Sequence, residues 1–382
     1  MSFQTQTLDE IVASVIEELA KTASERDKIG GTAKEQRDFI RKSGLLTLDA
    51  DWQTILDITR KIATVDSSLA HLIGYHYLCQ ASVELYGSPK QVAFFKAETS
   101  AHQYFWGNAF NPLDTHVKAE WDGDSWIING TKSFCSGASD SDRLLISAQK
   151  IDGSGPLIAV IPTNRQGIFV HDDWDSFGQR QTDSGKVTFD GVKVEKEETL
   201  TAYEAGEGNL FATVRTHIAQ SILVHVLLGT AEGAFDMAKN YTLTQTRPWV
   251  TSHVEEAGVD PYHLYHYGEL YVKLQAASAL AAISTKTLDD TWQLKQAITP
   301  QQRGACSIAV ATAKVQVSQT ALDVTSTIFQ MMGARATSAK YNFDRYWRNV
   351  RTHTLHDPID YKLRDLGQFT LHQQYPEISA YS

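Results

Sequence analysis

Two histidines near the C-terminus have the type and the spacing for proton chemistry. His353 and His356 lie three residues apart, so they share one face wherever this segment is helical. His71 and Tyr75 form a second pair, four residues apart. An imidazole titrates at about pH 6.5 and can donate or accept a proton at neutral pH. Taken alone, such pairs are more often ordinary surface or core features. A metal site is not expected, because no third ligand lies at a suitable spacing.

Residues 1–100 have the periodicity of helices. Apolar residues repeat at three-and-four spacing between Leu8 and Leu19, and Thr7 is expected to be the N-cap. Ser88-Pro89 places a proline in the first turn of a further short helix. The other helices of this region are expected at 33–43, 51–64 and 66–86, the last capped by Asp66. We predict an N-terminal helical domain at 1–100.

Between residues 101 and 206 the apolar period falls towards two, which is typical of strands. Apolar runs such as Leu144–Ile146 and Leu157–Ile161 alternate there with turn signals. The signals of the hairpin kind are Asp122-Gly123, Asn129-Gly130 and Asp190-Gly191. We predict a central β domain at 101–206, folded as a barrel or a sandwich.

Residues 207–382 return to the helical period. Gly229 and Gly233 lie one turn apart in the first segment and indicate close helix packing. Pro248 and Pro300 interrupt the helical pattern and separate the expected helices. The helices are expected at 207–245, 262–289, 299–332 and 341–352. Long helices with short connections predict a C-terminal four-helix bundle, so the fold class is α+β.

This order of helices, β domain and bundle is that of the acyl-CoA dehydrogenase fold, and a segment of the β domain has a matching pattern. Residues 129–137 read Asn-Gly-Thr-Lys-Ser-Phe-Cys-Ser-Gly. They resemble the segment that acyl-CoA dehydrogenases place against the isoalloxazine ring. Phe134 and Ser136 hold the positions of its aromatic and hydroxyl residues. The segment from Gly178 to Val194 also falls at the family's spacing.

A third match lies at the end of the third long helix. Residues 330–336 read Gln-Met-Met-Gly-Ala-Arg-Ala. They resemble the turn that meets the flavin of a neighbouring subunit in this family. The resemblance therefore implies a homotetramer with shared flavin sites.

The position of the dehydrogenase base decides between the branches of the family. In many acyl-CoA dehydrogenases a glutamate, between a tyrosine and a glycine, removes the proton next to the thioester. Here Asp357 takes the place of the glutamate, His356 that of the tyrosine and Pro358 that of the glycine. The run 346–358, together with 245–249, instead resembles the flavin-dependent monooxygenases built on the acyl-CoA dehydrogenase fold.

The resemblance implies a two-component monooxygenase. A separate flavin reductase would supply reduced FMN, and O2 would add to the flavin C4a atom to give a (hydro)peroxyflavin. The oxygen would pass to a small aromatic or organosulfur substrate. This would be a dibenzothiophene-like thiophene or a thioether, oxidised to the sulfoxide or sulfone. The protein would hold the flavin, exclude water and offer the reacting oxygen a hydrogen-bond partner.

The resemblance also assigns roles to residues. The implied catalytic residues are His356, His71, Tyr75, Ser136 and Asn108. The implied cofactor-binding residues are Phe134, Ser136, Asn108, Trp174, Ser184, Arg247, Arg335 and His353. The two arginines suit the FMN phosphate, since a guanidinium binds phosphate with paired hydrogen bonds.

Two alternatives stay open at this point. One is an FAD-dependent acyl-CoA dehydrogenase, which the altered base position disfavours. The other is a non-catalytic flavin-binding relative, which the set of histidine, tyrosine and asparagine residues disfavours. The sequence does not decide between FMN and FAD, name the natural substrate, or show whether 250–267 is a mobile lid.

Composition narrows the remaining classes. The chain has 382 residues, of which 42% are hydrophobic and 21% are charged, as in an ordinary globular protein. With 35 basic and 45 acidic residues its net charge is −10, so nucleic acid is not an expected partner. No signal peptide and no membrane-spanning run are expected. Cys79, Cys135 and Cys306 are widely separated, which fits a reducing cytoplasm.

Overall fold

The computed structural model describes residues 6–111, 113–200 and 209–382. The expected boundary at residues 206 and 207 lies outside these ranges, as do residues 1–5, on which the expected absence of a signal peptide partly rests. The N-terminal region contains α1 (Leu8–Ile29), α2 (Lys34–Ser43), α3 (Trp52–Ala63), α4 (Ser67–Tyr86) and α5 (Pro89–His102). The helices predicted for this region are confirmed.

The predicted N-caps are also present. The Thr7 side chain accepts a hydrogen bond from the amide of Glu10 in a capping box. The Asp66 carboxylate accepts one from the amide of Leu69 at 2.9 Å. Ser88, which was not predicted as a cap, caps α5 in the same way. Each cap gives a partner to an amide that the helix itself cannot satisfy.

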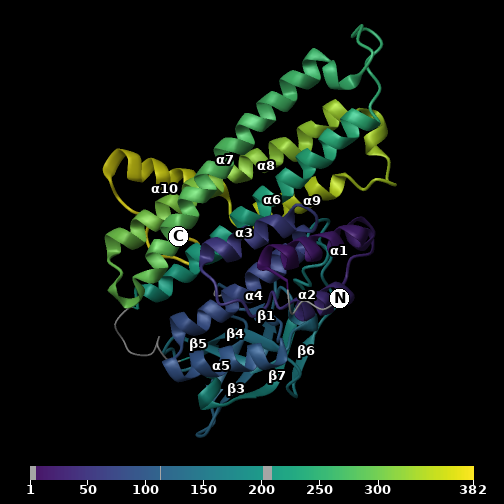
Figure 1. Ribbon diagram of the computed structural model, residues 1–382. Coiled ribbons are helices and arrows are strands. Elements are labelled where there is room, and N and C mark those ends of the chain that lie inside the picture. The colour runs from purple at the N-terminus through teal and green to yellow at the C-terminus, as the bar shows by residue number, and fades with distance from the viewer. Residues whose placement is uncertain (1–5, 112, 201–208) are drawn as a thin grey trace.

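Helix α4 carries His71 and Tyr75 into the interior. Its side chains are buried on nearly every face, unlike those of an amphipathic surface helix. It lies between the β-sheet and the long helix α6 (Val214–Thr244), as Figure 1 shows. A Cβ atom at Gly74 would collide with Ile222 of α6, so glycine permits this close approach beside the two site residues.

The predicted β domain is one curled seven-stranded sheet with its own core. Its strands run in the order β1-β4-β2-β3-β7-β6, and β5 also pairs with β4. Strands β1 and β2 run parallel to β4, and the other pairs are antiparallel. The strands are β1 (Trp106–Ala109), β2 (Lys118–Trp121), β3 (Trp126–Lys132), β4 (Arg143–Lys150), β5 (Pro156–Pro162), β6 (Ile168–Val170) and β7 (Val187–Val194).

Only one of the three hairpin signals is a turn. Asp122-Gly123 lies between the antiparallel strands β2 and β3, as expected. The other two expectations are wrong, because Asn129-Gly130 lies within β3 and Asp190-Gly191 within β7. The pairing of β3 with β7 shifts register there, and the amide of Gly191 donates to Asn129 Oδ1 at 2.7 Å. The positive φ that glycine permits in a tight turn serves a β-bulge equally well.

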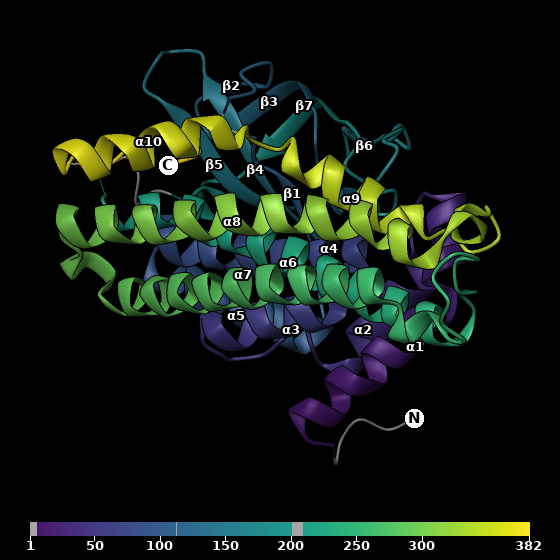
Figure 2. The same cartoon turned by 90° about the horizontal axis from the view of Figure 1, so that it is seen from above.

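The C-terminal region is a bundle around three long helices. These are α6, α7 (Pro261–Gln293) and α8 (Pro300–Met332), which Figure 2 shows running side by side. The expected fourth helix is α9 (Asp344–Thr354), and a further helix that the prediction missed, α10 (Ile359–His372), follows it. Pro358, the N-cap residue of α10, lies at the break between them.

Helix α6 corrects one expectation and confirms another. Residues 211–244 are long and apolar enough to cross a membrane by length and composition alone, contrary to the expectation of no such run. However, 78% of the most apolar window is buried inside the fold, as in a core helix. Gly229 and Gly233 of α6 face the backbone of α3 so closely that a Cβ atom would collide with Arg60 and Thr64. The predicted close helix packing is therefore confirmed.

Candidate active site

The loop that follows β3 meets α4 at His71. The His71 Nε2 atom lies 3.1 Å from the hydroxyl of Ser136, which in turn lies 2.8 Å from that of Ser184. Two backbone hydrogen bonds fix this loop, because Cys135 donates to Gly185 and Gly137 donates to Thr182. Thus the two segments that resembled acyl-CoA dehydrogenase sequences are joined directly, and Ser184 is linked to His71 through Ser136.

The hydroxyls of Ser136, Ser184 and Thr182 form one hydrogen-bonded row, and the position of each hydrogen follows from the Thr182 end. The Thr182 hydroxyl lies 3.0 Å from the carbonyl oxygen of Gln179 and donates to it, because a carbonyl can only accept. Thr182 must then accept from Ser184 at 2.7 Å, and Ser184 must accept from Ser136. Ser136 has no hydrogen left to give, so it accepts from Nε2 of His71.

His71 therefore carries its hydrogen on Nε2 and leaves Nδ1 as an acceptor. This Nδ1 atom is buried and has no hydrogen-bond partner among the described residues. Burial, and secondarily the charge of His356, lowers the pKa of His71 to about 3, so its ring is neutral at physiological pH. A buried acceptor without a donor is costly in a protein interior. A bound molecule that donates a hydrogen bond would satisfy this atom.

A second set of contacts holds His353 against His71. Their ring centres are 4.8 Å apart. The Gln179 side-chain amide contacts Nδ1 of His353 at 3.3 Å and donates to the Ser67 hydroxyl at 2.6 Å. Burial, followed by the neighbouring charges, lowers the pKa of His353 well below its usual value. Sequence reasoning missed Gln179, whose only signal was its place inside a family-like segment between a glycine and an arginine.

Tyr75 and Asn108 complete the polar side of the cluster. The ring of Tyr75 stacks on that of His71 at 4.0 Å. The amide of Asn108 donates to the Ser136 carbonyl at 3.0 Å, so β1 lies directly against the loop. The Asn108 side-chain oxygen accepts from Arg215 at 3.4 Å, a residue that the sequence analysis did not single out.

Phe134 and Trp174 form an aromatic corner beside this cluster. Phe134 has a φ of 59° and a side chain that is 63% exposed, which is unusual for a phenylalanine. Its ring meets that of Trp174 edge to face at 6.1 Å. The Trp174 indole N–H donates to the Gln179 carbonyl at 2.8 Å and is thereby fixed. The corner offers a planar aromatic group a wall to lie against.

His356 lies beyond the end of α9, so it does not share a helical face with His353 as the spacing suggested. Its Nδ1 atom lies 3.2 Å from a carboxylate oxygen of Asp357, and its ring faces Tyr381. The His356 side chain is 37% exposed, unlike that of His71. It still acts on His71 electrostatically, since its charge contributes to the lowered pKa of His71.

Asp357 itself is buried between two lysines that sequence reasoning missed. Lys314 of α8 and Lys362 of α10 each place their ammonium nitrogen 3.6 Å from a different oxygen of the Asp357 carboxylate. Gln220 of α6 also donates to this carboxylate at 3.3 Å. Burial alone would raise the pKa of Asp357, but His356 and the two lysines hold it well below its usual range.

The two predicted phosphate ligands lie elsewhere in the chain. Arg247 and Arg335 are both exposed. The charge of Arg335 acts on the hydroxyl of Tyr241, so these two side chains lie near each other. Tyr241 lies eleven residues, or about 16 Å, further along α6 than Thr230, whose hydroxyl donates to Ser67 beside the His71 cluster. Within one chain the structure therefore does not bring these arginines to the cluster.

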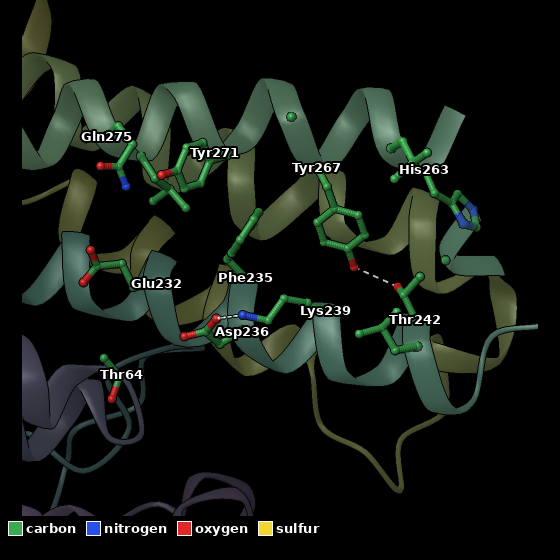
Figure 3. A pocket seen from close by; sticks show the side chains of 15 residues that line it. Thr64, Glu232, Phe235, Asp236, Lys239, Thr242, His263, Tyr267, Tyr271 and Gln275 are labelled. Atoms are coloured by element: carbon green, nitrogen blue, oxygen red, sulfur yellow. Dashed lines mark hydrogen bonds and ion pairs between the residues drawn. The ribbon is translucent and has the colours of Figure 1, made fainter. Parts of the chain in front are cut away.

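A pocket of about 720 Å³ lies between α6 and α7, apart from the cluster. Figure 3 shows Phe235 and Lys239 on one side and Tyr267 and Tyr271 on the other, with Tyr267 contacting Thr242 at 2.7 Å. The segment 250–267 contributes His263, Leu264 and Tyr267 to the wall. None of the predicted site residues lines this pocket.

The comparisons with known proteins agree with this geometry. Residues 107–192 match the acyl-CoA dehydrogenase middle domain, and residues 221–361 match the acyl-CoA dehydrogenase C-terminal domain. The chain is 45% identical over 378 residues to the probable FMNH2-dependent monooxygenase SfnC of Pseudomonas putida, covering 96% of this chain and 95% of that protein. The chain belongs to the flavin-dependent monooxygenases of the acyl-CoA dehydrogenase fold.

Two solved structures of such monooxygenases are very similar. Methanesulfinate monooxygenase MsuC of Pseudomonas fluorescens is 44% identical with a TM-score of 0.96, over 99% of this chain and 100% of that one. TdsC of Paenibacillus sp. A11-2, a dibenzothiophene monooxygenase solved with FMN and indole, is 40% identical with a TM-score of 0.94, over 98% and 99% of the two chains. The resemblance found in the sequence is therefore confirmed, and the chain is an oxidoreductase.

Proposed function

We propose that this flavin-dependent monooxygenase takes reduced FMN from a separate flavin reductase and transfers one oxygen atom of O2 to the sulfur of a small organosulfur compound. The names of its relatives support this, since they include an FMNH2-dependent monooxygenase and monooxygenases of methanesulfinate and dibenzothiophene. The observation that carries the proposal is His71, which is neutral, fixed in one tautomer and left with a buried, unpaired acceptor.

The residues around His71 fit FMN. Phe134 and Trp174 offer a wall to the flavin ring, while Ser136 and Asn108 offer polar atoms to its edge. When bound, reduced FMN reacts with O2 and supplies the electrophilic oxygen. Arg247 and Arg335 stay candidates for the phosphate, provided that a neighbouring subunit brings them to this site.

The protein's own groups have three tasks in this scheme. His71 Nδ1 accepts a hydrogen bond at the reacting centre, and the stacked ring of Tyr75 keeps it in place. The buried surroundings of His71 and His353 exclude water, which would otherwise divert the oxygen to hydrogen peroxide. His356 is exposed enough to exchange protons with solvent.

Asp357 argues against the dehydrogenase alternative. A base at this position would need a free carboxylate that can take up a proton next to a thioester. Asp357 instead lies between Lys314, Lys362 and His356, which hold its pKa well below the usual range. Such a carboxylate is a weak base.

A rapid-mixing experiment tests the proposed function. The protein, loaded anaerobically with reduced FMN, is mixed with oxygenated buffer, with and without dibenzothiophene or methanesulfinate. We expect slower flavin reoxidation than in free solution, faster reoxidation with a substrate, and formation of its oxygenated product. Reoxidation as fast as that of free FMN, with no product from either compound, would refute the proposal. FAD and acyl-CoA thioesters would then be tested.

We further propose that the chain forms a homotetramer. Large apolar side chains are exposed on α7 and on the segment before it, and one of them, Tyr271, also lines the pocket of Figure 3. A monomer rarely exposes so much apolar surface in one place. These exposed residues include Trp249, Val250, Tyr262, Tyr265, Tyr271 and Val272. Light scattering should give a mass of four chains, and a monomer at micromolar concentration would contradict the proposal.

A cytoplasmic location is proposed as well. Its support is chemical, because Cys79, Cys135 and Cys306 are all free and buried. The test is fractionation of cells that express the chain.

A further inference from the structure

The interior between α6, α8 and α10 contains more positive than negative charge. Lys314 is fully buried, and Lys362 is nearly so. Both face one carboxylate, that of Asp357. Asp365, the other carboxylate near Lys362, already pairs with Arg364 at 2.7 Å. Buried charges are expected to be paired, so one positive charge in this cluster has no counterion among the described residues.

Of the two lysines, Lys314 has the weaker contacts. Its Nζ atom makes no hydrogen bond among the described residues, and its nearest carboxylate oxygen is 3.6 Å away. Lys362 differs, because it donates to the carbonyl oxygen of Tyr381. Burial lowers the pKa of both lysines, and Asp357 only partly opposes this. An anion beside Lys314 would supply the missing partner.

Other polar atoms around this point also lack partners. All but one of them lie on α6 and α8, the two helices that pack against each other here, and the remaining one belongs to Asp357 between α9 and α10. Those on α6 span four residues, or about 6 Å, which fits a group of only a few heavy atoms. The unpartnered buried atoms are both ring nitrogens of His217, Oε1 of Gln220, Oγ of Ser221, Oγ of Ser318 and Oδ2 of Asp357.

The cluster adjoins the reacting centre. Asp357 contacts His356 directly. The charge of Lys314 contributes to the lowered pKa of His353, whose ring lies against His71. An anionic head group held at Lys314 would therefore belong to a molecule that extends towards His71.

We propose that Lys314 and Lys362 form a subsite for a small oxyanion and that the substrate is an anionic organosulfur compound, of the sulfinate type, rather than a neutral thiophene. This inference rests on the proposed oxygenation of sulfur. The cation of Lys314 pairs with the head group, and the Ser221 hydroxyl and the His217 ring supply hydrogen bonds to its oxygens.

Binding of methanesulfonate tests the subsite without turnover. The full chain, with and without oxidised FMN, is titrated with methanesulfonate by calorimetry. We expect saturable binding that Lys314→Met weakens about thirtyfold or more, because a buried ion pair loses its partner. Lys314→Arg should retain most of the binding. Lys286→Met, at an exposed position of α7, is the matched control and should bind like the wild type.

Three outcomes would overturn the subsite. They are no binding by the wild type, equal binding by Lys314→Met, and inorganic sulfate binding as tightly as methanesulfonate, which would indicate a general anion site. If Lys314→Met does not fold, Lys362→Gln and the rise of the wild-type melting temperature with methanesulfonate decide the question.

Steady-state oxygenation separates this inference from the proposed function. With methanesulfinate, Lys314→Met should raise KM at least about tenfold. Lys286→Met, the exposed control, should leave the KM for methanesulfinate unchanged. If the wild type oxygenates dibenzothiophene but neither binds nor oxygenates the anions, the function stands and the subsite is wrong. If the wild type oxygenates neither compound but binds methanesulfonate through Lys314, the subsite stands and the proposed function fails.

Discussion

At the scale of single residues, His71 combines a fixed tautomer with an unused acceptor. We predict that His71→Phe lowers the sulfur product formed per reduced FMN by about a hundredfold, the cost of losing a group that positions the reacting centre through a hydrogen bond. The measurement is a single-turnover assay with product quantified beside hydrogen peroxide. His102→Gln changes an exposed histidine and should keep the wild-type yield. An undiminished yield in His71→Phe would rule out this role.

The tautomer of His71 can be tested separately. Ser184→Ala removes the acceptor of the Ser136 hydroxyl, which could then turn and donate to Nε2 of His71. We predict that Nε2 carries the hydrogen in the wild type and is partly deprotonated in the variant. Nitrogen NMR of labelled histidine distinguishes the two forms. A change of tautomer in Thr188→Ala, a hydroxyl outside this chain of bonds, would contradict the explanation.

At the scale of elements, the start of α4 depends on Asp66. This residue caps the helix at Leu69, and its carboxylate lies 2.6 Å from the guanidinium of Arg26, with both side chains largely buried. Asp66→Ala removes the cap and leaves Arg26 without its charge partner. We predict a loss of about 3–5 kcal/mol in the free energy of unfolding, measured with urea. Asp290→Ala breaks an exposed ion pair with Lys286 and should cost less than about 1 kcal/mol.

The helices show what local patterns can predict. The expected spans 66–86 and 299–332 agree closely with α4 and α8, because three-and-four spacing and caps are local signals. The prediction missed α10, which is largely exposed, although Ile359, Leu366 and Phe369 give it a partly buried apolar stripe at helical spacing. The two false hairpin signals show that glycine marks a positive φ without saying whether a turn or a bulge uses it.

The site was predictable only where a family pattern covered it. His71, Tyr75, Ser136, Ser184 and Asn108 were found this way, and the structure brings them together. No local pattern indicates that two buried polar residues will pair across the whole chain. Gln179 lies 174 positions from His353, and Lys314 lies on an otherwise ordinary core helix. Such contacts exist only once the helices have packed.

At the scale of the whole molecule, several histidines are buried without charge. Burial lowers the pKa of His71 to about 3 and that of His76 to about 4. It lowers the pKa of His225 to about 3 and those of His217 and His353 well below the usual value. Between the unfolded pKa of about 6.5 and these folded values, the unfolded chain binds more protons than the folded one.

Stability should therefore fall as the pH drops below about 6.5. Each buried histidine lowers the free energy of unfolding by up to about 1.4 kcal/mol per pH unit, until the pH reaches its folded pKa. We expect the urea concentration at the midpoint of unfolding to fall steadily between about pH 6.5 and about pH 4, because the unfolded and folded pKa values of these histidines enclose that range. In His225→Gln, the free energy of unfolding should depend less steeply on pH, because about one proton fewer is taken up on unfolding. A midpoint that is constant over this range would contradict the burial of neutral histidines.

The chain of hydroxyls at Ser136, Ser184 and Thr182 has a consequence for proton conduction. It ends on the backbone carbonyl of Gln179, which has no hydrogen to release and does not take one up. A proton can neither enter nor leave the centre by this route, because the whole row points one way and ends blindly. This side of the site does not conduct protons. A proton that the reaction consumes has to take another route, and His356, whose side chain is 37% exposed to solvent, offers one.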